Sequence, residues 1–77
     1  MSRIRYDIVP APDGWRVVCD GVAGSAYSEQ SAAVLDTLAA AETLIKRGDK
    51  VEVRLLELDG PSQVWRSLQP QDAALYR

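Results

Sequence analysis

The sequence of 77 residues contains no histidine and a single cysteine, Cys19. One cysteine excludes an internal disulfide, and a lone thiol without an imidazole cannot assemble the usual four-ligand structural zinc site. A chain of this length buries only about 60% of its unfolded surface, so its core alone provides modest stability. We therefore expect neither a metal nor another cofactor, and self-association remains the available route to extra stability.

The sequence also lacks an excess of basic residues and any long apolar run. Its formal net charge is -2, and charges of both signs are spread along the chain. This distribution is typical of an ordinary soluble surface, whereas nucleic-acid-binding domains usually carry a strong basic excess. Because there is no apolar leader and no run of roughly 18 apolar residues, we expect a cytoplasmic protein with no membrane partner.

What is present is a set of three Asp-Gly pairs, at Asp13-Gly14, Asp20-Gly21 and Asp59-Gly60. Asp-Gly favours tight hairpin turns because the central turn residues need positive φ. Around the first pair, strict alternation of apolar residues predicts two strands with one common buried face, formed by Ile4, Tyr6, Ile8, Trp15, Val17 and Cys19. The same alternation after the second pair predicts a third strand whose buried face carries Val22, Gly24 and Ala26.

From Ser28 the apolar period changes from two residues to 3.6, which predicts a helix over 29–47. Its core stripe is expected to contain Val34, Leu38, Ala41 and Ile45. Ser28 is the expected N-cap, and Gly48 suits the left-handed position after the last turn.

Two further strands are predicted after the helix, with Val51, Val53, Leu55, Val64 and Leu68 facing the core. A second apolar set, Leu56, Leu58 and Trp65, is out of phase and falls on the opposite face. Apolar residues on that face need a cover, from the tail of the chain or from another chain. A short helix beginning at Pro70 is expected over 70–77, with Leu75 and Tyr76 folded onto this set.

These elements define an α+β fold in the order β-β-β-α-β-β, as one domain over 1–77. We expect one mixed or antiparallel sheet with strand order 3-2-1-4-5 and a single long helix on one face. The strands are predicted at about 3–9, 15–20, 22–27, 50–58 and 63–68.

The segments Tyr6-Asp7-Ile8-Val9-Pro10 and Asp13-Gly14-Trp15-Arg16-Val17 resemble the opening of a family of short bacterial domains of unknown function. Those domains begin with a strand that ends in Val-Pro, then a turn, then Gly-Trp-x-Val. The segment Lys50-Val51-Glu52-Val53, which leads to Leu58-Asp59-Gly60, is similar to the second half of that family. The family often carries a histidine in the strand before this last turn, and this sequence does not. The resemblance implies a compact bacterial domain and brings no known activity.

No catalytic constellation stands out in the sequence, and we predict no catalytic, cofactor-binding or metal-binding residues. Cys19 has no histidine to activate it, so a buried, inert thiol is the favoured interpretation. The run Gly21-Val22-Ala23-Gly24-Ser25 lacks the Gly-Lys-Ser/Thr ending of a phosphate loop. The protein is therefore not expected to be an enzyme.

Two hypotheses of function remain. The first is a bacterial protein-interaction module that binds itself, as a homodimer, or another protein through Leu56, Leu58 and Trp65 or through an exposed edge strand. The alternative is weak binding of RNA or single-stranded DNA by an outer sheet face that carries Arg3, Arg5, Arg16 and Arg54. Asp7 and Glu52 share that face, which favours cross-strand ion pairs over nucleic-acid binding.

Overall fold

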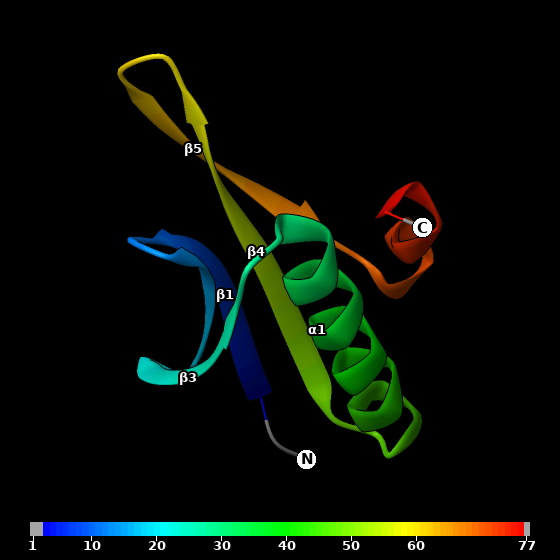
Figure 1. The fold of residues 1–77 in the computed structure, drawn as a ribbon. Coiled ribbons are helices and arrows are strands. Elements are labelled where there is room, and N and C mark those ends of the chain that lie inside the picture. Colours follow the sequence, from blue (N-terminus) through cyan, green and yellow to red (C-terminus); the bar gives the residue numbers. More distant parts are fainter. Residues whose placement is uncertain (1–2, 77) are drawn as a thin grey trace.

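The computed structural model describes residues 3–76 and contains a five-stranded mixed sheet with one long helix (Figure 1). The elements are β1 (Arg3–Ala11), β2 (Gly14–Cys19), β3 (Val22–Tyr27), α1 (Gln30–Lys46), β4 (Lys50–Asp59), β5 (Ser62–Leu68) and the 3-10 helix η1 (Pro70–Tyr76). The α+β class and the element order are confirmed. Residues 1, 2 and 77 of the predicted domain lie outside the described residues.

The strand order is β3-β2-β1-β4-β5, as predicted. β1 and β4 run parallel at the centre of the sheet, and the other neighbours are antiparallel. The register between β1 and β2 pairs Tyr6 with Cys19 and Ile8 with Val17. The two apolar sets predicted from alternation therefore lie on the same face.

The core lies between this face of the sheet and α1. Its buried residues are Ile8, Val17, Ala33, Val34, Leu38, Ala41, Val53, Leu55 and Leu68. The prediction for Ile45 is wrong, since its side chain is 43% exposed. The buried row along α1 runs through Val34, Thr37 and Ala41, and at that spacing Leu44 rather than Ile45 continues it.

Of the two capping residues predicted for α1, the one at the C-terminal end is confirmed and the one at the N-terminal end is wrong. The N-cap residue is Glu29 rather than Ser28, and it makes no side-chain capping bond. At the other end, Gly48 has a φ of 95° and donates to the Ile45 carbonyl at 3.0 Å, while Asp49 donates to that of Leu44 at 3.1 Å. These two bonds form a Schellman motif, which satisfies the last carbonyls of the helix.

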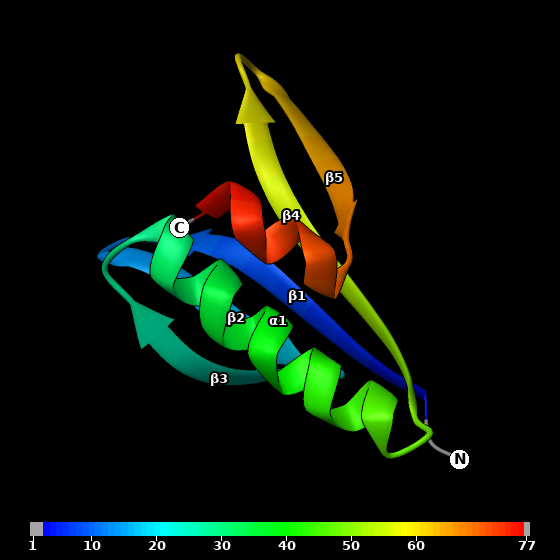
Figure 2. The same cartoon turned by 90° about the vertical axis from the view of Figure 1, so that its right-hand side faces the viewer.

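The tail does not fold where the sequence predicted. η1 lies beside α1, on the same side of the sheet (Figures 1 and 2). Ala73 and Tyr76 pack against the core, and Leu75 is 78% exposed. The reason is that Leu68, the last residue of β5, points into the core and Asp72 closes a tight turn back to Gln69. The opposite face of the sheet, the outer face, is not covered by the tail.

β3 also departs from the simple alternation. Cys19 pairs with Val22 and Val18 with Ala23, but the register then shifts, so that Trp15 pairs with Tyr27. One extra residue in β3 forms a bulge, which changes the face to which the following side chains point. Val22, Gly24 and Ala26 are all exposed rather than buried, and Tyr27 takes the core-facing position predicted for Ala26.

Candidate functional site

The predicted interface residues lie together on the outer face. Leu56 pairs directly with Trp65 across β4 and β5, and Leu58 is two positions further along the same face of β4. They belong to the distal part of the β4–β5 hairpin, residues 56–66, which projects beyond the rest of the sheet and which we call the arm (Figures 1 and 2). Leu58 is 63% and Trp65 43% exposed. The arm therefore presents large apolar side chains to solvent.

The four arginines proposed for nucleic-acid contact are also on the outer face, but two of them are engaged within the chain. Arg54 donates to both carboxylate oxygens of Asp7, at 2.9 and 3.2 Å, and this hydrogen bonding raises the pKa of its guanidinium. The Arg5 Nε lies 3.4 Å from the same carboxylate. Arg3 and Arg16 pair across the sheet with Lys50 and Val9. Binding of RNA or single-stranded DNA stays a prediction, and this geometry weakens it.

Arg54 also connects the polar centre of the outer face to the arm. Its guanidinium carbon lies 4.3 Å from the centre of the Trp65 ring, a cation–π contact. Asp7, at the other side of Arg54, is buried although no helix covers this face. Arg54 of the same chain therefore holds the Trp65 ring in place, and Trp65 is still 43% exposed to solvent.

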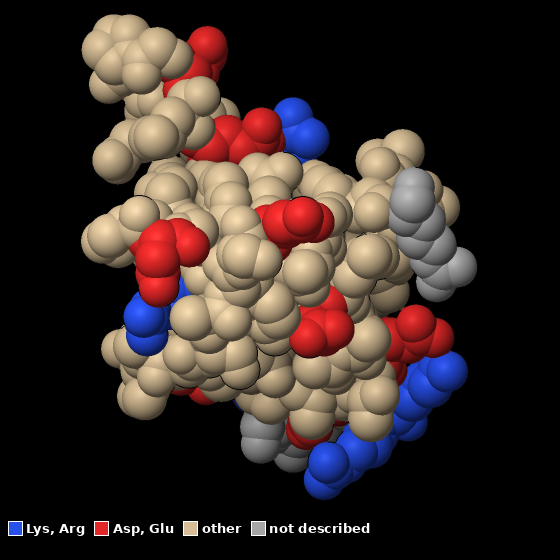
Figure 3. Space-filling model, in the orientation of Figure 1, with Lys and Arg blue, Asp and Glu red and all other residues tan. Residues whose placement is uncertain are grey.

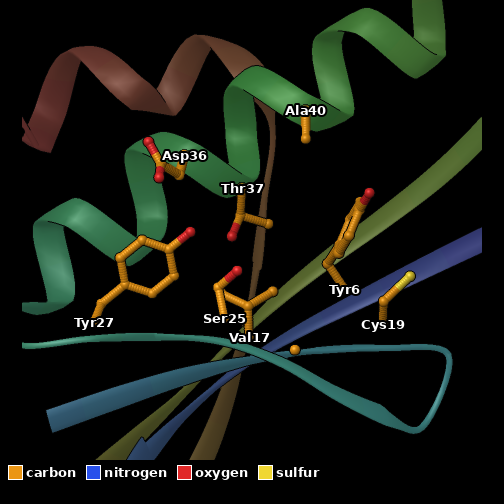
Figure 4. A pocket seen from close by; sticks show the side chains of 9 residues that line it. Tyr6, Val17, Cys19, Ser25, Tyr27, Asp36, Thr37 and Ala40 are labelled. Atoms are coloured by element: carbon orange, nitrogen blue, oxygen red, sulfur yellow. The ribbon is translucent and has the colours of Figure 1, made fainter.

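A cleft that the sequence did not predict lies on the other face, between α1 and strands β2 and β3 (Figure 4). It has a volume of about 250 Å³. Its polar lining consists of Tyr6, Cys19, Ser25, Tyr27, Asp36 and Thr37. Most of these groups are hydroxyls, and Asp36 supplies the one carboxylate.

The cleft opens because small side chains meet there. Gly24 contributes no side chain and Ala40 only a methyl group, so α1 and β3 do not fill the space between them. The bulge in β3 also turns Ser25 and Tyr27 toward the helix (Figure 4). Bulges are frequent beside functional sites because they redirect side chains in this way.

The electrostatics of the cleft are set by burial and by negative charge. Burial, first, and then a hydrogen bond to Asp36 raise the pKa of Tyr27, which a bond with Ser25 partly offsets. Burial raises the pKa of Cys19, with the charge of Asp20 as the second cause. Burial likewise raises the pKa of Tyr6, with further contributions from Cys19 and Asp20.

These shifts predict a loss of stability in alkaline solution. When folding raises the pKa of a thiol or phenol, the protonated group stabilises the folded protein. This stabilisation is fully present at pH values below the pKa of the group in the unfolded chain, about 8.5 for cysteine and 10 for tyrosine. This contribution disappears as the pH rises through the folded pKa. Urea unfolding followed by circular dichroism between pH 7.5 and 10.5 should show the free energy of unfolding falling from about pH 8.5. Cys19→Ser should remove the earliest part of the decline, and an identical profile in this variant would contradict the assignment.

Thr37 is the polar group in the cleft that the fold leaves unsatisfied. Its side chain is in the buried row of α1 and the residue is 4% exposed. Within residues 3–76 its Oγ1 has no hydrogen-bond partner, and Figure 4 shows this oxygen directed toward Ser25. A buried hydroxyl without a partner costs about 1–3 kcal/mol. Thr37 therefore places an unsatisfied hydrogen-bonding atom in the wall of the cleft.

No group of three or more potential metal-ligating side chains occurs within residues 3–76. No helix in the described part of the chain has the length and apolar character needed to cross a bilayer. Comparison with protein-family models, curated proteins and solved structures gives no match. The family resemblance described above therefore stays a prediction.

Proposed function

We propose that this chain is a non-catalytic protein-interaction module that forms a homodimer through the arm. The observation that carries the proposal is β5, where two large apolar neighbours, Val64 and Trp65, point to opposite faces and are 47% and 43% exposed. A strand with apolar side chains on both faces suits the interior of a sheet rather than its edge. Yet β5 is an edge strand in this chain.

A second copy of the chain fits this edge. Two β5 strands related by a two-fold axis near Trp65 would pair antiparallel, and the hydrophobic contacts would be repeated on both sides of the axis. The arm carries both signs of charge, with Glu57 and Arg66 already paired at 2.7 Å, so a copy of itself meets no uniform repulsion. By contrast, the other edge strand, β3, offers mainly small side chains.

The solvent-accessible surface of the single chain is larger than expected for a compact monomer of its mass, which supports the proposal of a partner. It exposes 5038 Å², whereas a compact monomer of 8.4 kDa is expected to expose about 4,600 Å². The arm projects beyond the rest of the sheet and so adds exposed surface (Figure 2). Pairing along β5 would cover part of this surface and add the stability that a small core supplies only modestly.

The test is the oligomeric state of the protein and of Trp65→Glu. Sedimentation equilibrium on the unaltered chain should give a dimer, and Trp65→Glu should raise the Kd at least tenfold, or about 1.4 kcal/mol. The expected cause is a charge placed at the centre of the interface. Val22→Glu is the matched control, since Val22 is a 69% exposed apolar residue on the opposite edge strand.

Three outcomes would overturn the proposal. A strict monomer at the highest soluble concentration would exclude a homodimer. A dimer that Val22→Glu disrupts while Trp65→Glu does not would place the interface at β3 instead. Salt-dependent binding of mixed RNA oligonucleotides by the monomer, lost in Arg3→Glu, would favour the alternative function.

A further inference from the structure

The cleft between α1 and β3 has features that the proposed dimer does not use. It lies on the helix side of the sheet and at the edge strand opposite to the arm. Its volume of about 250 Å³ corresponds to the liquid volume of about eight water molecules. It is therefore large enough for a small organic molecule and too small for a nucleotide or a folded partner.

From these features we infer that the cleft binds a small organic ammonium ion, a primary amine of no more than about a dozen heavy atoms. Thr37 Oγ1 is one basis for this inference, because it is a buried polar atom in the wall of the cleft without a partner among the described residues. A ligand that donates a hydrogen bond would satisfy it and recover the cost of its burial.

The charge of the lining selects a cation. Asp36 is a cleft residue, and no lysine or arginine lines the cleft within the described chain. Hydrogen bonding with Asp36 raises the pKa of Tyr27, so the phenol and this carboxylate are neighbours at the cleft. On the face seen in Figure 3, acidic side chains are spread over the centre, while basic ones gather at the C-terminal end of α1. An anionic ligand would be repelled by Asp36, and no basic side chain in the described lining would offset that repulsion.

The remaining lining suits an ammonium group with a short apolar body. The hydroxyls of Ser25 and Thr37 offer acceptors for N–H donors, of which an ammonium has three. The ring of Tyr27 faces the same space and can attract a cation (Figure 4). Val17 and Ala40 supply the apolar wall.

The experiment is a titration of the ¹⁵N-labelled full chain with n-butylammonium, 1-butanol and butanoate at equal ionic strength. We expect saturable amide shifts at Ser25, Tyr27 and Thr37 with n-butylammonium, and at least fivefold weaker binding of the neutral and anionic analogues. Cys19, the only cysteine in the sequence, provides a second readout. Its alkylation by iodoacetamide should slow in the presence of n-butylammonium and not of butanoate.

Matched variants separate the cleft from the rest of α1. Asp36→Asn and Thr37→Val should each weaken n-butylammonium binding at least fivefold. Glu42→Gln and Thr43→Val, on the solvent side of the same helix, should leave it unchanged. Thr37→Val removes an unpartnered hydroxyl, so it should fold at least as stably as the unaltered chain. Absence of saturable shifts at the cleft, or butanoate binding as tightly as n-butylammonium, would overturn the inference.

Discussion

Gly14→Ala is expected to cost about 3–5 kcal/mol of folding free energy, a large part of the total for a domain of this size. Gly14 has a φ of 142°, which L-residues with a side chain rarely adopt. A Cβ built there would lie 2.2 Å from the carbonyl oxygen of Tyr27 and 3.0 Å from the Cα of Ser28. Both contacts are with backbone, so the connection between β3 and α1 would have to move.

Gly60→Ala is the matched control for that substitution. Gly60 also has a positive φ, 61°, but a Cβ added there meets nothing within 4 Å. Its replacement should lower the free energy of unfolding by only about 1 kcal/mol, the usual cost of holding alanine in the left-handed backbone conformation. Urea unfolding followed by circular dichroism gives both values. Equal losses in the two variants would contradict the close approach of Tyr27 to the first turn.

Leu38→Ala is expected to destabilise the protein by about 3 kcal/mol, through lost apolar burial and the cavity left behind. Leu38 is 1% exposed and is one of the four largest fully buried side chains. With the modest total stability of a 77-residue chain, the midpoint of thermal unfolding should fall by roughly 12–24 °C.

Leu75→Ala provides the comparison for the core variant. Leu75 has the same side chain but is 78% exposed on η1. Its truncation should change the free energy of unfolding by less than about 0.5 kcal/mol. A loss at Leu75 as large as that at Leu38 would indicate that the tail packs more deeply than the structure shows.

The sheet was predictable because local turn chemistry and alternation agree. The first hairpin turns at Pro12-Asp13 rather than Asp13-Gly14, because Ala11 already pairs with Gly14. The parity argument still holds, since either of the two even loop lengths considered places Ile8 opposite an odd-numbered residue such as Val17. The change of period at Ser28 and the glycine at position 48 then bound the helix to within a residue or two. These are short-range signals, which a single sequence carries well.

What could not be predicted depends on tertiary geometry. The bulge in β3 lies at Gly24 and Ser25, which together oppose Val17, and it shifts the pairing of Tyr27. A glycine inside a strand often marks a bulge, but Gly24 is also compatible with a regular strand, so the sequence did not decide between the two. The side of the sheet to which η1 returns is set by the direction of Leu68, not by the composition of the tail. The cleft follows from both the bulge and the helix position, so Thr37 and Asp36 carried no signal as site residues.

The candidate interface was easier to find than the cleft. Adjacent leucines at 55 and 56 break the alternation of β4, which a bulge or a second covered face could explain. The register between β4 and β5 has no shift, so Leu56 faces the side opposite to Leu55 without a bulge. The arginine set was found by the same parity argument. The sequence predicted cross-strand ion pairs on this face, and the register of the parallel ladder, which it did not fix, places Arg54 opposite Asp7.

The parallel ladder between β1 and β4 has a consequence for how the chain assembles. The β1–β2–β3 meander and the β4–β5 hairpin can each form from neighbouring residues, whereas joining them brings together positions as distant as Arg3 and Lys50. This closure carries the largest loss of chain entropy in the sheet. The packing of α1 against strands of both halves offsets this loss of entropy. The helix therefore joins two locally folded pieces into one domain.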